Sequence, residues 1–260
     1  MINYNPVLID LDGVIRIGDK IADGAFELFN FLNRNNIPSC IISNSTRNTS
    51  REVIQFLNEN GVTFTVNAMT TVDATIRFLK EKNYHVSVYC IQNVQKEFEP
   101  FIEDENPDAV IIGDLGEGWT YPILNDIFRK VYDGAEIIAM QKNKFWQPEG
   151  KSLALDAGAF VAAIEYAAGK KATVIGKPSP LYFKSALKML GYSEDNSFYM
   201  IGDDLENDIG GAQSIGGTGI LVFTEKTKYP LLPDTKILPS FESQNLFSVL
   251  EVLEDIFLKN

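Results

Sequence analysis

Residues 7–14, Val-Leu-Ile-Asp-Leu-Asp-Gly-Val, constrain the fold of this 260-residue chain more than any other stretch. A short apolar run of this kind is typical of a strand that is buried on both faces. Because a strand interior does not tolerate an unpaired carboxylate, we expect Asp10 at the carboxyl end of the strand, where open α/β sheets bind ligands. Asp12 follows two residues later, and Gly13 lets the backbone turn away. The stretch therefore predicts an acidic site at one edge of a parallel sheet.

The rest of the chain alternates between strand-like and helix-like segments. Short apolar runs predict strands at residues 40–42, 86–91, 109–112, 136–139, 173–175, 198–201 and 219–223. Apolar residues at helical spacing predict helices at residues 25–32 (with Asp23 as the N-cap), 50–60, 71–82, 122–132, 159–168, 180–190 and 246–257. This alternation is typical of a doubly wound parallel sheet with helices on both faces, so we predict an α/β fold.

The composition limits the partners and the location of the chain. The formal net charge of −12 argues against nucleic acid or an anionic membrane as the main partner. No apolar run approaches the ~20 residues of a spanning helix, and no signal peptide is evident. Cys40 and Cys90 lie in apolar runs and are expected to be buried, reduced thiols, while the single histidine, His85, excludes a His-rich zinc site. We therefore expect a soluble, cytoplasmic protein.

Polar clusters follow three of the predicted strands. They are Asp10 with Asp12, Ser43 with Asn44, and Asp203 with Asp204 and Asp208. Because the carboxyl ends of parallel strands open on one edge of a sheet, we expect these clusters to converge. Five carboxylates in one crevice would repel one another and raise one another's pKa. A hard divalent cation relieves this repulsion, and Mg²⁺ suits an all-oxygen site that retains bound water.

The predicted crevice also contains groups that could bind phosphate. Lys177 precedes a proline and a helix start, so it can bind a phosphoryl group and help to keep Asp10 ionised. Ser43 and Asn44 can donate hydrogen bonds to phosphoryl oxygens. One carboxylate can attack phosphorus while a second moves the proton of the leaving group. These parts match what phosphoryl transfer requires, namely in-line attack, a metal ion and fixed hydrogen-bond donors.

The ordered motifs resemble those of a known enzyme superfamily. The order Asp-Leu-Asp-Gly at residues 10–13, Ser-Asn at 43–44, Lys-Pro at 177–178 and Gly-Asp-Asp-x-x-x-Asp at 202–208 resembles the haloacid dehalogenase (HAD) superfamily of phosphatases. The long insert between the second and third motifs is similar to that of the NagD-like type (subfamily IIA), which has a large α/β cap. The runs at residues 158–167, 175–180 and 208–213 are similar to a narrower group of phosphatases within that type.

This resemblance implies a domain organisation and an activity. It implies a doubly wound, HAD-like Rossmannoid core formed by residues 1–78 and 177–260, with an α/β C2-type cap inserted at residues 79–176. The implied activity is Mg²⁺-dependent hydrolysis of a small phosphorylated compound through an aspartyl-phosphate, with the cap closing over the site to exclude bulk water. A large cap leaves little room for a protein substrate. Relatives of this type often form homodimers through the cap, but the sequence leaves the oligomeric state of this chain open.

The resemblance further implies roles for the carboxylates of the first and last motifs. Asp10 matches the nucleophile and Asp12 matches the general acid/base. Asp10, the backbone carbonyl of Asp12 and the side chain of Asp203 match the groups that bind Mg²⁺. Asp204 and Asp208 match positions that hold metal-bound water or orient the motif lysine. For Asp204 an alternative stays open, in which its side chain is only solvated and has no direct role.

Phosphate-binding roles come from the second and third motifs. Ser43 and Asn44 fall where relatives usually have Thr-Asn, and serine keeps the hydroxyl. Lys177 matches the phosphate-binding lysine. Arg47 either touches phosphate or lies at the surface, and residues 141–156, which include Phe145 and Trp146, form either a substrate-selecting cap loop or ordinary cap packing.

Other functions remain open alternatives. A phosphomutase would use the same aspartyl-phosphate but return the phosphoryl group to a sugar. A haloacid dehalogenase needs no metal and normally lacks the second aspartate of the first motif, so Asp12 argues against it. A phospho-accepting signalling switch also uses an Asp, a Lys and Mg²⁺, but a receiver-like domain is shorter and has no cap. The substrate stays open among pyrophosphate, phosphohistidine, sugar phosphates and nucleotides.

Overall fold

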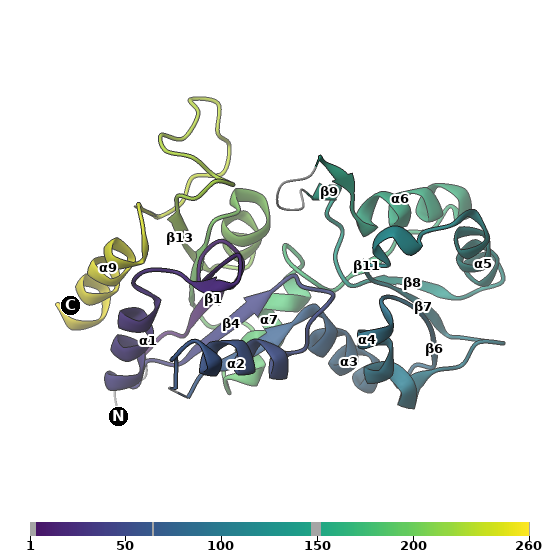
Figure 1. The fold of residues 1–260 in the computed structure, drawn as a ribbon, viewed down its shortest axis with the longest axis horizontal. Coiled ribbons are helices and arrows are strands. Elements are labelled where there is room, and N and C mark those ends of the chain that lie inside the picture. The colour runs from purple at the N-terminus through teal and green to yellow at the C-terminus, as the bar shows by residue number, and fades with distance from the viewer. Residues whose placement is uncertain (1–3, 64, 147–151, 260) are drawn as a thin grey trace. The chain divides into compact units, whose positions relative to one another are not determined.

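The computed structural model describes residues 4–63, 65–146 and 152–259 (Figure 1). The chain divides into two compact units, each of which contains a parallel sheet and helices. The first unit consists of Met1–Ser43, Ser50–Met69 and Lys177–Asn260, and the second of Asn44–Thr49 and Thr70–Gly176. The predicted α/β class is confirmed.

The first unit is built on a six-stranded sheet in the order β14-β13-β12-β1-β4-β5. Its strands are β1 (Val7–Asp10), β4 (Ser39–Ser43), β5 (Asn67–Thr70), β12 (Tyr199–Gly202), β13 (Thr218–Val222) and β14 (Phe241–Ser243). Strand β1 is central and pairs in parallel with both β12 and β4. Since Asp10 is the last residue of β1, it lies at the carboxyl edge of the sheet, opposite Ile42 of β4.

One face of this sheet packs against three helices. They are α1 (Ala25–Arg34), α2 (Ser50–Glu59) and α9 (Leu246–Leu258). Alternate residues of the strands, such as Val7, Ile9 and Ile220, join the apolar residues of these helices in one buried cluster. This packing follows from the period of two along a strand, which directs every second side chain to the same face.

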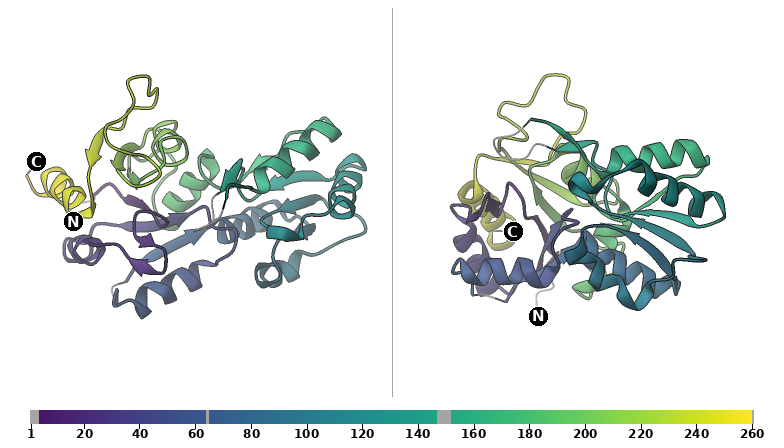
Figure 2. Two further views of the ribbon diagram at one scale, coloured as in Figure 1. Left: turned by 45° about the horizontal axis from the view of Figure 1, so that its top comes forward. Right: turned by 45° about the vertical axis from the view of Figure 1, so that its right-hand side comes forward.

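The opposite face packs against α7 (Pro180–Met189), the π-helix η3 (Leu205–Gly210) and the short α8 (Gly211–Gln213). Gly219 shows how close this packing is, because a Cβ there would lie 2.7 Å from the side chain of Ile209 on η3. Its neighbour Ile220 faces the first cluster, so η3 lies on the other side of the sheet. Figure 2 shows the helices on both faces. The sheet is therefore doubly wound.

The second unit has its own four-stranded parallel sheet in the order β11-β8-β7-β6. Its strands are β6 (Val86–Tyr89), β7 (Ala109–Ile112), β8 (Glu136–Ala139) and β11 (Thr173–Val174), and its helices are α3 (Thr71–Lys82), α4 (Gln92–Gln95), η1 (Lys96–Phe101), η2 (Gly116–Gly118), α5 (Tyr121–Tyr132) and α6 (Ala157–Ala168). Apolar residues of α5 and α6 form a buried cluster with β7 and β8. Helices α3 and α4 lie across the sheet from α6 (Figure 1).

Two small antiparallel hairpins complete the described structure. The first pairs β2 (Arg16–Ile17) with β3 (Lys20–Ile21) directly after β1. The second pairs β9 (Phe145–Trp146) with β10 (Ala154–Leu155), within the stretch predicted to select substrate or pack the cap. Residues 147–151 of that stretch lie outside the described residues. Among the described helices, none combines the length and the apolar character needed to cross a bilayer.

The unit division and one helix cap differ from what the sequence predicts. The predicted boundary at residues 78 and 79 falls inside α3, but the structure groups this whole helix with the second unit. The prediction of Asp23 as the N-cap of α1 is wrong, because Gly24 occupies that position with φ 86°. A Cβ on Gly24 would lie 3.0 Å from the Cβ of Leu246, so the start of α1 is set by close packing against α9.

We predict that Gly24→Ala destabilises the protein more than Gly61→Ala does. Both glycines have a positive φ, 86° and 90°, which costs an L-residue about 1–2 kcal/mol. Alanine at Gly61 would meet nothing within 4 Å, whereas alanine at Gly24 would also press on Leu246 and Phe247. That overpacking adds ~1–3 kcal/mol. Urea unfolding of the two variants measures the difference, and equal losses would contradict the packing argument.

Candidate active site

Asp10 forms a buried ion-pair network at the carboxyl edge of the first sheet. It is 6% exposed, and its Oδ1 lies 2.5 Å from Nζ of Lys177. The same ammonium lies 2.7 Å from Oδ1 of Asp208 and donates a hydrogen bond of 3.3 Å to the carbonyl of Ile42. Lys177 is 3% exposed, so this charge is held away from bulk water. The lysine thus links the ends of β1 and β4 to η3.

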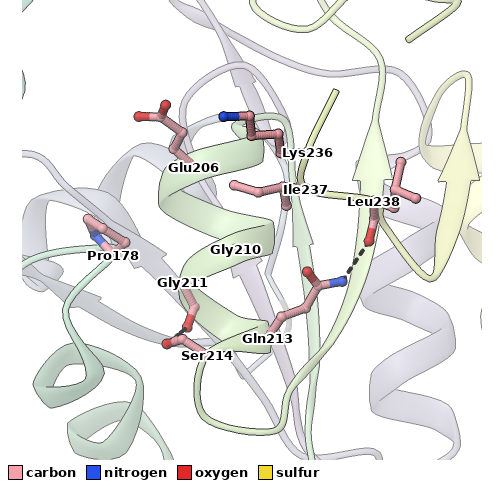
Figure 3. A pocket seen from close by; sticks show the side chains of 9 residues that line it. All are labelled: Pro178, Glu206, Gly210, Gly211, Gln213, Ser214, Lys236, Ile237 and Leu238. Atoms are coloured by element: carbon pink, nitrogen blue, oxygen red, sulfur yellow. Dashed lines mark hydrogen bonds between the residues drawn. The ribbon is translucent and has the colours of Figure 1, made fainter. Parts of the chain in front are cut away.

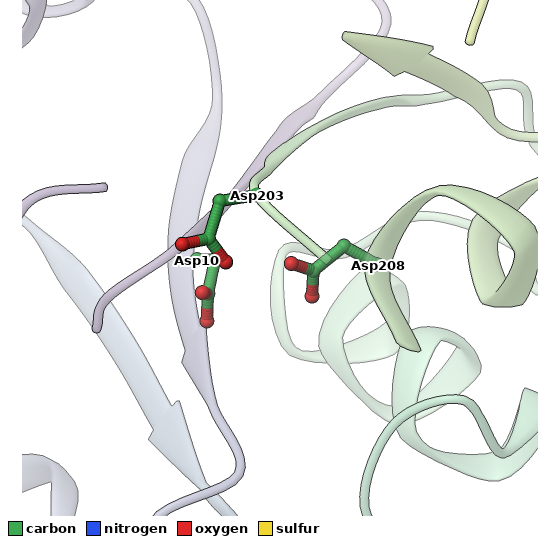
Figure 4. Close-up of side chains that lie close together, drawn as sticks. All are labelled: Asp10, Asp203 and Asp208. Carbon is green, nitrogen blue, oxygen red and sulfur yellow. The ribbon is translucent and has the colours of Figure 1, made fainter. Parts of the chain in front are cut away.

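Asp203 and Asp208 complete the cluster with Asp10 (Figure 4). Asp203 directly follows β12, and Asp208 lies on η3. Two glycines make space for these carboxylates, because a side chain at either position would collide with one of them. A Cβ on Gly13, which has φ 90°, would meet Oδ2 of Asp203, and a Cβ on Gly202 would meet the carboxylate of Asp208. Both glycines are therefore required by close approach of the carboxylates.

One carboxylate oxygen from each of the three aspartates lies within 4.8 Å of the other two. Burial raises the pKa of Asp10, and the charges of Asp208 and Asp203 raise it further, while Lys177 opposes the rise. Burial alone would lower the pKa of Lys177, but the charges of Asp10 and Asp208 outweigh it and the pKa is raised. One buried lysine therefore leaves negative charge in the cluster uncompensated.

The cluster fits a hard divalent cation. All three groups offer carboxylate oxygens, which are the ligands that Mg²⁺ and Ca²⁺ prefer. Oδ1 of Asp203 is buried and accepts no hydrogen bond within the described residues. Because a buried acceptor without a partner is costly, this atom is a suitable ligand for a cation.

A turn after β13 holds Asp203 in place. The hydroxyl of Thr224 donates to Oδ2 of Asp203 at 2.7 Å, and the hydroxyl of Thr227 donates to its carbonyl at 2.6 Å. Lys226, between them, lies 3.7 Å from Oδ1 of Asp203 and 3.0 Å from Oδ2 of Asp204. Sequence reasoning missed these residues. The same strand-end argument would have found them if it had been applied to the predicted strand at residues 219–223.

The side chain of Asp12 points away from the three-carboxylate cluster. Its Oδ1 accepts hydrogen bonds from Nε and Nη2 of Arg16 at 2.8 and 2.5 Å, and its Oδ2 accepts one from the Ser43 hydroxyl at 3.3 Å. The Asp12 side chain is 53% exposed. Arg16 belongs to the β2–β3 hairpin and packs over the ring of Phe56 on α2. Sequence reasoning missed Arg16, because the hairpin has no apolar run to predict it.

The second-motif residues Ser43 and Asn44 lie at the end of β4. Ser43 is buried, and its carbonyl accepts a hydrogen bond of 2.6 Å from the hydroxyl of Tyr182. Tyr182 also donates to the carbonyl of Met69 at the end of β5, so a helix of the opposite face anchors two strand ends. Asn44 directly follows Ser43 and is grouped with the second unit.

Asp204 acts as the N-cap of η3. Its Oδ1 accepts hydrogen bonds from the backbone N–H groups of Glu206 and Asn207, and its Oδ2 accepts one from the Asn207 amide. Burial would raise the pKa of Asp204, but the charge of Lys226 and these hydrogen bonds lower it. Asp204 therefore supports the helix that carries the last aspartate of the motif.

Arg47, Glu206 and the two cysteines are not part of the three-carboxylate cluster. Arg47 pairs with Asp114 at 2.8 Å within the second unit, and its side chain is half-exposed. Glu206 is exposed and lines an open pocket beside η3 and α8 that also includes Pro178 and residues 236–238 (Figure 3). None of the predicted site residues lines this pocket. Cys40 and Cys90 are buried and form no disulfide with each other.

We predict that Asp10→Asn gains stability relative to the wild type as the pH rises from about 5 to about 8 in EDTA. A carboxyl group whose pKa is raised in the folded state holds a proton that the unfolded chain releases. The stability that this proton gives the folded wild type is therefore lost as the pH rises towards the pKa of the folded state. Asp10→Asn has no such proton and shows no such loss. Urea unfolding at several pH values measures the free-energy difference.

Asp126→Asn is the control for this pH series. The hydrogen bond from Tyr89 opposes burial and lowers the pKa of Asp126, so the folded and unfolded values both lie below the tested range. Its offset from the wild type should stay constant over that range. A constant offset for Asp10→Asn as well would contradict the raised pKa.

Comparison with known proteins agrees with this geometry. Two family models match the chain: the haloacid dehalogenase-like hydrolase model over residues 7–101 and the HAD-hydrolase-like model over residues 174–246. The haloacid dehalogenase-like hydrolase domain-containing protein 2 of Bos taurus is 34% identical over 235 residues, which is 90% of this chain and 89% of that protein.

Two further similarities extend over nearly the whole chain. The phospholysine phosphohistidine inorganic pyrophosphate phosphatase of Mus musculus is 31% identical over 97% of this chain and 94% of that protein. The structure of NagD from E. coli K-12 has a TM-score of 0.79 at 23% identity and covers 94% of this chain and 98% of that one, which shows a shared fold. The chain therefore belongs to the haloacid dehalogenase-like hydrolase family, and it is similar to a phosphatase over nearly its whole length.

Proposed function

We propose that the chain is a Mg²⁺-dependent phosphatase that hydrolyses small phosphorylated compounds through an aspartyl-phosphate on Asp10. The observation that carries this proposal is the buried cluster of Asp10, Asp203 and Asp208 with a single buried lysine at its centre. The Mus musculus relative is named for phospholysine, phosphohistidine and inorganic pyrophosphate, and these compounds are the first substrates to test.

The proposed metal ligands are the side chains of Asp10 and Asp203 and the backbone carbonyl of Asp12. Asp208 belongs to the same cluster and is placed to hold a water molecule of the ion or to orient Lys177, from which it lies 2.7 Å. When bound, Mg²⁺ would neutralise charge on the carboxylates and on the phosphoryl oxygens. Oδ1 of Asp203, which is buried and accepts no hydrogen bond within the described residues, supports this assignment.

In the proposed first step, the Asp10 carboxylate attacks phosphorus and the bond from phosphorus to the leaving group breaks. Asp12 gives its proton to the leaving atom, which keeps the bonding electron pair. In the second step, Asp12 takes a proton from water, and the resulting hydroxide attacks phosphorus, releasing phosphate and restoring Asp10. The exposed side chain of Asp12 and its separation from the buried cluster suit a group that exchanges protons with water.

The remaining motif residues are assigned to the phosphoryl oxygens. We assign Ser43, Asn44 and Lys177 to hydrogen bonds with these oxygens, where fixed donors stabilise the charge that develops in the transition state. Lys177 is held by two carboxylates, so its ammonium stays charged and oriented. Asp204 acts through η3, whose N-terminus it caps, in this proposal.

Three further features belong to the proposal. The first unit would be the catalytic core, and the second would be the cap that closes over the substrate and excludes water. Cys40 and Cys90, which are buried and form no disulfide with each other, are compatible with a reducing, cytoplasmic location. Homodimer formation is also proposed, on the resemblance alone.

We predict that Asp10→Asn reduces phosphate release by three orders of magnitude or more, to about the background rate. Asparagine cannot form the acyl phosphate, while it nearly preserves the size of the side chain. The measurement is release of inorganic phosphate from an aryl phosphate and from a panel of phosphorylated metabolites, with Mg²⁺ and with EDTA. Near wild-type activity of Asp10→Asn, or full activity in EDTA, would refute the mechanism.

We predict that Asp12→Asn loses about 10²–10⁴-fold in activity, with an effect on the first step that depends on the leaving group. 4-Nitrophenolate leaves without protonation, so this variant should release a burst of nitrophenol and then stall at the aspartyl-phosphate. An alkyl phosphate should give no burst. Equal losses for both substrates, without a burst, would contradict the acid/base role of Asp12.

The same assay separates the alternatives. A wild-type burst without turnover would favour a phospho-accepting switch. Turnover that requires a sugar bisphosphate, with transfer to the sugar rather than to water, would favour a phosphomutase. Metal-independent release of halide from a haloacid would favour a dehalogenase.

A further inference from the structure

We propose that Lys226 is an internal counter-ion that competes with the divalent cation for the carboxylates of Asp203 and Asp204. This inference rests on the proposed function, which assigns Asp203 to the metal ion. The ammonium of Lys226 lies 3.0 Å from Oδ2 of Asp204 and 3.7 Å from Oδ1 of Asp203. No motif predicts this residue, and the proposed mechanism does not use it.

The turn at residues 224–227 fixes Lys226 to the site through Asp203. The N–H of Thr224 donates to the carbonyl of Thr227 at 3.0 Å, which closes the turn. The hydroxyl of Thr224 accepts from the N–H of Lys226 at 3.1 Å and donates to Oδ2 of Asp203 at 2.7 Å. The hydroxyl of Thr227 donates to the Asp203 carbonyl. The backbone that carries Lys226 is therefore tied to the carboxylate that its charge faces.

Lys226 interacts differently with the two aspartates. At 3.0 Å, the ammonium and Asp204 form a direct ion pair, whereas 3.7 Å is too long for a hydrogen bond to Asp203. Lys226 thus neutralises charge near Asp203 without satisfying Oδ1, which is buried and has no hydrogen-bond partner within the described residues. Burial raises the pKa of Asp203, and the charge of Lys226 opposes this rise.

An incoming cation would meet the like charge of Lys226. Like charges a few ångströms apart repel each other, and they do so more strongly near a protein surface than in open water. Lys226 is half-exposed, whereas Lys177 is buried, so only Lys226 has a route to move aside into water. We therefore infer that Lys226 weakens cation binding and makes it exchangeable, while Lys177 stays a fixed part of the site.

The test is an equilibrium titration of the full-length, metal-stripped protein with Mn²⁺ alone, without substrate. The electron paramagnetic resonance signal of free Mn²⁺ measures the dissociation constant. Lys226→Met should bind Mn²⁺ about fivefold to tenfold more tightly than the wild type, because a like charge has been removed. Lys226→Arg keeps the charge and should bind as the wild type does.

Lys228→Met is the matched control. Lys228 lies on the same loop and carries the same charge, but it pairs with Glu225 at 3.2 Å. Its removal should leave the Mn²⁺ affinity unchanged. Lys226→Gln provides a second neutral side chain if the methionine variant fails to fold, which circular dichroism will report.

Two outcomes would overturn the inference without touching the proposed function. They are wild-type affinity in both neutral variants of Lys226, and an equal gain in Lys228→Met, which would reflect net charge alone. Loss of Mn²⁺ binding in Asp203→Asn would verify that the titration reports on this site. Failure of the wild type to bind Mn²⁺, or unchanged binding in Asp203→Asn, would instead refute the proposed metal site, and this inference would fall with it.

Discussion

The structure of the first unit depends on the cost of removing carboxylates from water. Asp10, Asp203 and Asp208 are all buried within reach of one another, which is unfavourable unless cations are held among them. Lys177 supplies one such cation, and two glycines allow the carboxylates to approach so closely. Strand β1 must be central for this arrangement, because it places Asp10 between the end of β12 and the end of β4.

Two lysines balance this acidic edge in different ways. Lys177 reaches the cluster from the segment before α7 and is almost completely buried. Lys226 reaches it from a turn after β13 and remains half-exposed. The first is surrounded by its partners on several elements, whereas the second faces water on one side. The metal site that we propose would therefore have one fixed positive charge and one that can move aside.

The gathering of Asp10, Asp203 and Asp208 could be expected from the sequence, because the carboxyl ends of parallel strands share an edge. Helix α3 could be predicted to the residue from its apolar spacing. The direction of the Asp12 side chain could not, since it is set by Arg16 on a two-residue strand with no periodic pattern. The N-cap of α1 was also predicted wrongly, because it is Gly24 and not Asp23.

These misses share a physical cause. Gly24 begins α1 because α9, far away in the sequence, packs against it and excludes a side chain. The Asp12 side chain is likewise held by a hydrogen bond from Ser43, at the end of β4. Local propensity and spacing describe a segment by itself, so contacts between distant segments decide the details that they leave open.

The strand order also has a consequence for biosynthesis. Strand β1 is synthesised before its partner β12, which begins at Tyr199, after the whole second unit. Until β12 has been made, one edge of this apolar strand has no neighbour, and exposed strand edges of this kind promote aggregation. The nascent chain therefore has to keep this edge from pairing with other extended segments while the whole second unit is being synthesised.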